Sequence, residues 1–173
     1  YKPPHIITNA ELVEAFNAYA TLQNERNAQR IAAGEVQPMV TSSVEFIEKA
    51  SGIKQRYVID KAGVLDPTRM KPHFEPRSDE QLSVMAEIAV AAAKQALAAA
   101  GRTGADVDAV LSSAANMQRA YPAMAIEIQQ AIGAHGYGFD MNVACSSATF
   151  AIEQGVNAIR CGSARCVLVV NPE

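Results

Sequence analysis

The residue best suited to covalent chemistry is Cys145, which directly follows a predicted strand at residues 138–144 and precedes a predicted helix at residues 146–160. Ligands approach an open α/β sheet at the carboxyl ends of its strands, where this position falls. The free amides and the dipole of the following helix stabilise a thiolate there. Such a thiolate attacks acyl thioesters, and the amide of the same residue can bind the developing oxyanion.

Simple packing is the competing explanation for a free cysteine, because cysteine is among the most buried residue types. From its position alone, Cys145 is open to both interpretations. Packing is favoured for Cys161, in the last turn of a helix, and for Cys166, in an apolar strand, since neither has an apparent activating group. Three cysteines without paired CxxC or Cys/His spacing predict neither a disulfide framework nor a metal site.

Other reactive residue types are less well placed. The histidines fall in terminal, loop and turn segments, where a solvent-facing role is favoured over that of a general base; they are His5, His73 and His135. Ser146 and Ser147 lack a Gly-x-Ser-x-Gly elbow and are predicted to begin the helix. The glycines of residues 133–138 precede a strand instead of following one, so no nicotinamide cofactor is expected, nor any other cofactor.

A second group of residues is predicted at the same sheet edge. Tyr121, which follows Asn116 and Met117 in a loop after the predicted strand 107–113, is placed to line an acyl channel. An aromatic residue packed at a helix entrance explains Tyr121 equally well.

The elements that position these residues alternate from residue 107 onward. The pattern predicts strands at 107–113, 138–144 and 164–170, with helices at 122–132 and 146–160. Such alternation with short connections predicts a parallel sheet covered by helices on both faces. The longest helix is predicted before them, capped at residues 78–81 and ended by Gly101.

The N-terminal part is predicted to hold shorter elements. Capping boxes at Thr8 and Ser42 predict helices that begin near Asn9 and Ser43, the second ending at Gly52. A strand is predicted at residues 56–59. Residues 18–41, helical as far as position 33, and residues 60–77 are predicted to be surface or lid segments.

Composition excludes several classes of protein. A chain of 173 residues, 49% hydrophobic and 19% charged, is typical of a globular domain with a sizeable core. A net charge of −3 gives no electrostatic reason to expect nucleic acid or an anionic membrane as a partner. The longest apolar stretch is interrupted by Glu87 and Lys94, and no secretory signal is evident, so we expect no membrane span and a cytoplasmic location.

The segment around Cys145 resembles a known family. Residues 140–150, Asp-Met-Asn-Val-Ala-Cys-Ser-Ser-Ala-Thr-Phe, followed by a helix and by Val-Leu-Val-Val at 167–170, resemble the nucleophile segment of β-ketoacyl-acyl carrier protein synthase III. Supporting motifs occur in the family's order along nearly the whole chain. The long segments 18–41 and 60–77 resemble the subgroup that makes β-ketodecanoyl products from a medium-chain primer.

The resemblance implies an α/β fold, the N-terminal half of a thiolase-like αβαβα layered structure. Residues 1–173 would lack its first strand and its whole C-terminal half, which supplies a His, an Asn and a glycine-rich turn. It also implies an acyltransferase of fatty acid biosynthesis that joins an acyl-coenzyme A or acyl-carrier-protein primer to malonyl-acyl carrier protein by decarboxylative Claisen condensation.

The resemblance further implies roles for individual residues. Cys145 would accept the primer acyl group, and Tyr121 would reach across a homodimer interface to shape the partner's acyl pocket beside Met117. Phe46 stands where acetyl-primed members place Trp, and Ala50 where they place Arg, so the coenzyme A contacts are expected to differ.

Two alternatives remain open. The first keeps the fold and nucleophile but changes the acceptor, as in thiolases, hydroxymethylglutaryl synthases or head-to-head acyl condensers. The second is a non-catalytic partner subunit that shapes the acyl channel of a heterodimer.

Overall fold

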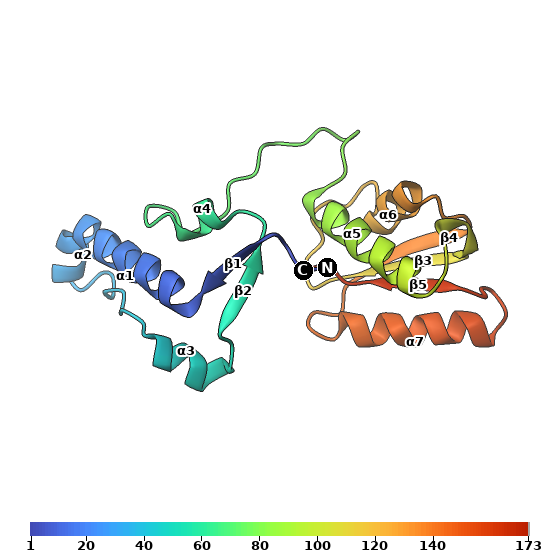
Figure 1. Ribbon diagram of the computed structural model, residues 1–173. Helices are drawn as coiled ribbons and strands as arrows, with labels where there is room; N and C mark the ends of the chain where they lie inside the picture. The colour runs from blue at the N-terminus through green and yellow to red at the C-terminus, as the bar shows by residue number, and fades with distance from the viewer. Residues whose placement is uncertain (173) are drawn as a thin grey trace. The chain divides into compact units, whose positions relative to one another are not determined.

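The computed structural model describes residues 1–172, which divide into a unit from Lys2 to Glu75 and a unit from Pro76 onward (Figure 1). Composition predicted one globular domain, whereas contacts cluster separately in the two units.

The Lys2–Glu75 unit is built on two antiparallel strands, β1 (His5–Thr8) and β2 (Gln55–Val58). Its helices are α1 (Asn9–Arg26), α2 (Ala28–Ala32), α3 (Val44–Ser51) and α4 (Lys61–Leu65). The first helix leaves β1 without a loop because the side chains of Thr8 and Glu11 each accept a hydrogen bond from the other's backbone amide. Buried Asn9 then donates to the Ile53 carbonyl at 2.6 Å and fixes α1 beside the segment that enters β2.

Several N-terminal predictions are confirmed and others are wrong. The Thr8 capping box and the left-handed Gly52, with φ of 70°, are present as predicted. The cap of α3 is Ser43, whose hydroxyl accepts the Phe46 amide, and not a box starting at Ser42. Residues 60–77 were predicted to be a surface or lid segment without a helix of its own, and here the Asp60 carboxylate caps the five-residue helix α4 by accepting the Gly63 amide at 3.0 Å.

The second unit is a three-layered α/β structure. Its strands β3 (Ala109–Ser113), β4 (Tyr137–Met141) and β5 (Val167–Val170) form a parallel sheet in the order β4-β3-β5. Its helices are α5 (Val84–Ala99), the short 3-10 helix η1 (Gly104–Asp106), α6 (Met124–Ile132) and α7 (Ser147–Arg160). Helices α5 and α6 cover one face and α7 the other, which confirms the predicted architecture (Figure 1).

The chain path explains why helices lie on both faces. From the central strand β3 the chain moves to β4 and then back across β3 to β5. Since both crossovers in such sheets are right-handed, the two directions of travel place α6 and α7 on opposite faces. The reversal falls between β3 and β4, whose carboxyl ends therefore form the edge at which a ligand is expected.

Close packing holds the helices on this sheet. Every residue of β3 is buried, and the alanines of α5 at positions 86, 89 and 93 are almost fully enclosed. Helix α6 approaches β4 closely at Gly138, which has no side chain. A Cβ added at this position would lie only 3.3 Å from the Cβ of Ala125. Gly155 does the same for α7 beside Val167.

The predicted boundaries need correction in this unit. Helix α5 is not the longest, since it has 16 residues and α1 has 18, and its cap is Ser83 instead of Ser78. Strand β3 begins at Ala109 because Val107 closes η1. Strand β4 ends at Met141 and not at residue 144, because the chain turns sharply before Cys145.

Candidate active site

Cys145 lies in a turn of residues 142–146, here called the cysteine turn, between β4 and α7. The thiol side chain is exposed within the described residues 1–172, as a nucleophile requires. Ala144 has a φ of 47°, a left-handed conformation that costs a residue with a Cβ about 1–2 kcal/mol. Such strain persists only where surrounding contacts impose it, and it concentrates at functional sites.

Two polar side chains impose this conformation. Ser147, 3% exposed in the first turn of α7, accepts the Val143 amide at 2.8 Å and donates to the Ala144 carbonyl at 2.7 Å. Asn142 accepts the Ala144 amide at 3.1 Å. The backbone on both sides of Ala144 is therefore fixed, and the next residue is Cys145.

A loop of residues 114–123, here called the tyrosine loop, follows β3 and lies against the cysteine turn. The side-chain amide of Asn142 donates to the Ala115 carbonyl at 3.0 Å. The backbone amide of Ala114 donates to the Met141 carbonyl at 3.2 Å. Adjacent parallel strands end at one edge of a sheet, so the predicted meeting of these two segments is confirmed.

The tyrosine loop presents Tyr121 outward. Its side chain is 89% exposed, whereas Met117 is half-buried. The loop ends where the Asp140 carboxylate accepts the amides of Met124 and Ala125 at 2.9 and 2.8 Å, so α6 begins at Met124 and not at the predicted Pro122. Tyr121 and Met117 thus share a unit with Cys145, and their contact with an acyl chain remains a prediction.

Phe46 belongs to the other unit. It lies on α3 with its side chain 67% exposed and borders a groove of about 560 Å³ together with Phe16 and Val40. The structure places Phe46 on an apolar surface of the Lys2–Glu75 unit, and its contact with a substrate remains a prediction.

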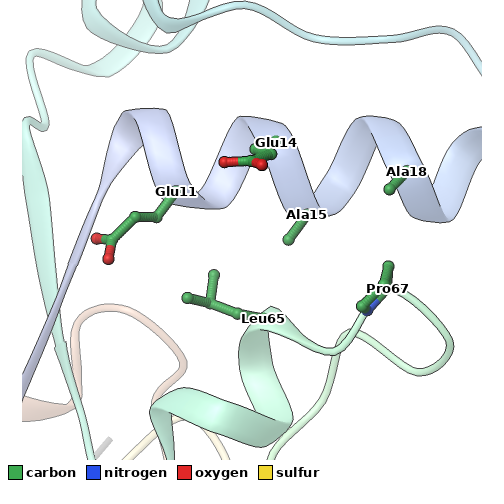
Figure 2. Close-up of a pocket in the computed structure, with 6 residues that line it drawn as sticks. All are labelled: Glu11, Glu14, Ala15, Ala18, Leu65 and Pro67. Carbon is green, nitrogen blue, oxygen red and sulfur yellow. The ribbon is translucent and has the colours of Figure 1, made fainter.

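A second cavity in the Lys2–Glu75 unit, of about 270 Å³, lies between α1 and α4. Figure 2 shows Leu65 and Pro67 facing Ala15 and Ala18, with Glu11 at one end. Hydrogen bonds from Lys61 and Thr8 lower the pKa of Glu11 to about 2. This cavity has an apolar floor and an acidic rim.

The remaining cysteines and histidines are distributed over both units. Cys161 is exposed, which contradicts its assignment as a packing residue; hydrogen bonding to Ser163 lowers the pKa of its thiol. All three histidines are exposed as predicted. His135 precedes β4 and so lies at the end of that strand opposite Cys145, whereas the ring of His73 contacts Glu75 at 2.9 Å.

Residues 1–172 contain neither a cluster of metal ligands nor a membrane-spanning helix. No group of three or more His, Cys, Asp or Glu side chains in this range is arranged to hold a metal ion. No helix among these residues combines the length and the apolar character needed to cross a membrane.

The residues that sequence reasoning missed are Asn142 and Ser147. In both residues a side-chain oxygen accepts a hydrogen bond from a backbone amide of the strand-to-helix turn, as short polar side chains commonly do. Short polar residues on either side of Cys145 were the sequence signal that could have indicated this supporting role.

Comparisons with known proteins agree with this geometry. The family model for 3-oxoacyl-[acyl-carrier-protein (ACP)] synthase III matches residues 139–173. The chain is 53% identical over 161 residues to the β-ketodecanoyl-[acyl-carrier-protein] synthase of Pseudomonas aeruginosa, covering 93% of this chain and 46% of that protein. It is 33% identical over 144 residues to the β-ketoacyl-[acyl-carrier-protein] synthase III of Granulibacter bethesdensis, covering 83% of this chain and 38% of that one.

The fold has solved counterparts. The crystal structure of 3-oxoacyl-[acyl-carrier-protein] synthase III from Aquifex aeolicus matches with a TM-score of 0.68 and 22% identity, covering 99% of this chain and 41% of that one. At this identity the match shows the thiolase-like α/β fold alone. The chain spans about half the length of the relatives it matches, or less. On the sequence match around Cys145 and the agreement along the rest of the chain, it belongs to the 3-oxoacyl-[acyl-carrier-protein] synthase III family.

Proposed function

We propose that Cys145 is the nucleophile of a condensing enzyme that joins an acyl primer to malonyl-acyl carrier protein in fatty acid biosynthesis. The thiolate attacks the carbonyl of the primer thioester, the coenzyme A or carrier-protein thiolate leaves, and an acyl-cysteine forms. Malonyl-acyl carrier protein then loses carbon dioxide, and the resulting carbanion attacks the acyl-cysteine. The Cys145 thiolate leaves, and a β-ketoacyl-acyl carrier protein is released.

The observation that carries this proposal is the cysteine turn. An exposed thiol directly follows a strained residue, at the carboxyl edge of a parallel sheet and beside the N-terminus of α7. Oriented amides in such a place favour negative charge on the thiolate and on a tetrahedral intermediate. The side chains around the turn are small, which leaves room for a thioester.

A medium-chain acyl thioester is the proposed primer. The 53% identical relative is named for a β-ketodecanoyl product, which a two-carbon extension of an octanoyl primer yields. Met117 and Tyr121, on the loop bonded to the cysteine turn, supply apolar surface for such a chain. Phe46 is the proposed contact for the thioester's carrier group.

A homodimer in the cytoplasm completes the proposal. Tyr121 is 89% exposed, as expected for a side chain that enters a partner's acyl pocket. Strand β4 is at the edge of the three-stranded sheet and carries exposed Tyr137 and Phe139, a surface suited to a second copy. Residues 1–173 correspond in this proposal to the N-terminal half of the thiolase-like fold, with 18–41 and 60–77 as surface or lid segments.

The reaction is tested with the full-length protein, octanoyl-coenzyme A and malonyl-acyl carrier protein. The expected products are β-ketodecanoyl-acyl carrier protein and carbon dioxide, and Cys145→Ala should form no β-ketoacyl product. Product formation by Cys145→Ala at the wild-type rate, or no condensation with any acyl primer, would contradict the proposal.

A further inference from the structure

A buried carboxylate lies behind the tyrosine loop. Glu127 on α6 is 5% exposed, and Glu is rarely this buried unless it is paired. Its carboxylate accepts hydrogen bonds from the Ser83 amide at 2.7 Å, from the Ser83 hydroxyl at 2.9 Å and from Arg119 Nη1 at 3.3 Å. Glu127 therefore connects the start of α5 to the middle of the tyrosine loop.

Arg119 belongs to that loop and is itself largely buried, with its side chain 15% exposed. Its Nη1 also donates to the Gln81 carbonyl at 3.2 Å. The preceding residue, Gln118, accepts the Met85 amide at 2.9 Å. Two consecutive residues of the tyrosine loop are thus bonded to the segment that opens α5.

The two ends of the tyrosine loop are held by different groups. Ala114 and Ala115 are bonded to the residues around the cysteine turn, and Asp140 caps α6 directly after the loop. Between these anchors, Arg119 is the side chain nearest in sequence to Tyr121 that is fixed by an ion pair. Because Tyr121 is exposed, the backbone of the loop determines where its ring stands.

We propose that Arg119 and Glu127 are positioning residues for primer selection: their buried ion pair fixes the tyrosine loop against α5, so that Met117 and Tyr121 form a fixed wall for the acyl chain. This inference rests on the proposed function, since that function gives Met117 and Tyr121 their role. The Arg119–Glu127 pair suits a rigid support, because losing one partner leaves a buried charge uncompensated.

The first test measures the loop itself in the full-length protein. Amide hydrogen exchange is compared between the wild type and Arg119→Met, which keeps an unbranched apolar stem and removes the charged guanidinium group. Peptides of the tyrosine loop should exchange faster in the variant, while the peptide that contains Cys145 keeps its wild-type rate. The matched control is Arg102→Met, at the far end of α5 and 58% exposed, which should leave the tyrosine loop unchanged.

The second test measures selection. We compare kcat/KM for acylation of Cys145 by octanoyl-coenzyme A and by butyryl-coenzyme A. In Arg119→Met the preference for the octanoyl primer should fall about tenfold, through a higher KM for that primer, with kcat for the butyryl primer retained. Glu127→Gln leaves the Arg119 charge unpaired but keeps an oxygen that can accept its hydrogen bond, so it should lower the preference less than Glu127→Leu, which should abolish it.

The outcomes separate the two proposals. Unchanged exchange in the tyrosine loop, or an equal loss with both primers, overturns the positioning role. If Arg119→Met does not fold, Arg119→Gln, which also removes the charge, is measured in its place. A wild-type preference in that variant and in Glu127→Leu also overturns the positioning role. Failure of every primer to acylate wild-type Cys145 overturns the proposed function, while the exchange result still decides whether the ion pair positions the loop.

Discussion

The side-chain amide of Asn142 donates a hydrogen bond to the carbonyl of Ala115 at 3.0 Å. This bond joins the turn that carries Cys145 to the loop that carries Tyr121. The same side chain accepts the amide of Ala144, whose φ is 47°. One residue therefore supports both the strained backbone beside the thiol and the neighbouring loop.

Replacing Asn142 should slow acylation more than it harms stability. Asn142→Ala removes both hydrogen bonds of an exposed side chain, which costs about 1 kcal/mol of unfolding free energy. Release of the strained Ala144 shifts Cys145, and a displacement of this kind lowers the rate by about tenfold or more. Single-turnover acylation of the full-length protein measures the rate, and chemical denaturation measures the stability.

The matched variant Asn142→Asp separates the two bonds. Its carboxylate can still accept the Ala144 amide but cannot donate to the Ala115 carbonyl. We expect acylation close to the wild-type rate, because the turn itself is preserved. A rate as low as that of Asn142→Ala would show that the bond to the tyrosine loop matters more than the strained turn.

Replacing Ser147 by alanine should lower the unfolding free energy much more than replacing Ser146. Ser147→Ala removes a buried hydroxyl that bonds both the Val143 amide and the Ala144 carbonyl, and losing these two hydrogen bonds should destabilise the protein by about 1–3 kcal/mol. The Ser146 side chain makes no capping hydrogen bond, so Ser146→Ala should stay within about 0.5 kcal/mol of the wild type. Equal unfolding free energies for the two variants would contradict this account of the turn.

Lys61 should control the titration of Glu11 beside the α1–α4 cavity. The folded-state pKa of Glu11 is about 2, below its ordinary value of 4.5, chiefly through the hydrogen bond from Lys61. A lowered pKa stabilises the fold above the unfolded value, and this contribution is lost as the pH falls from about 4.5 through 2.

In Lys61→Gln the pKa of Glu11 should rise part of the way toward 4.5, because the hydrogen bonds from Thr8 remain. A carbon NMR titration of the Glu11 carboxyl group measures it. Lys54→Gln, which removes an exposed lysine, is the control and should leave that titration unchanged. An unaltered Glu11 titration in Lys61→Gln would count against the ion pair.

Much of the fold is predictable because its signals are local. The Thr8 capping box, the left-handed Gly52 and the apolar strand β3 each follow from a few neighbouring residues, and the structure has all three. Helix α4 was missed because it has five residues and depends on a side-chain cap from Asp60 that composition does not reveal.

The support of the candidate site was less predictable because its contacts are not local. Alanine rarely adopts a positive φ, so nothing in the residue type of Ala144 indicates that the strand ends before it. The bonds from Glu127 to Ser83 join residues 44 positions apart, and no periodic pattern encodes such a pair. Sequence identified Cys145 as the best-placed thiol but could not determine whether it was exposed or buried.

The most direct test of the central claim is to locate the acyl group. The full-length protein is incubated with octanoyl-coenzyme A, digested, and sequenced by tandem mass spectrometry. The account predicts an octanoyl adduct on the peptide that contains Cys145 and none in Cys145→Ala. An adduct confined to Cys161 or Cys166, or one undiminished in Cys145→Ala, would contradict it.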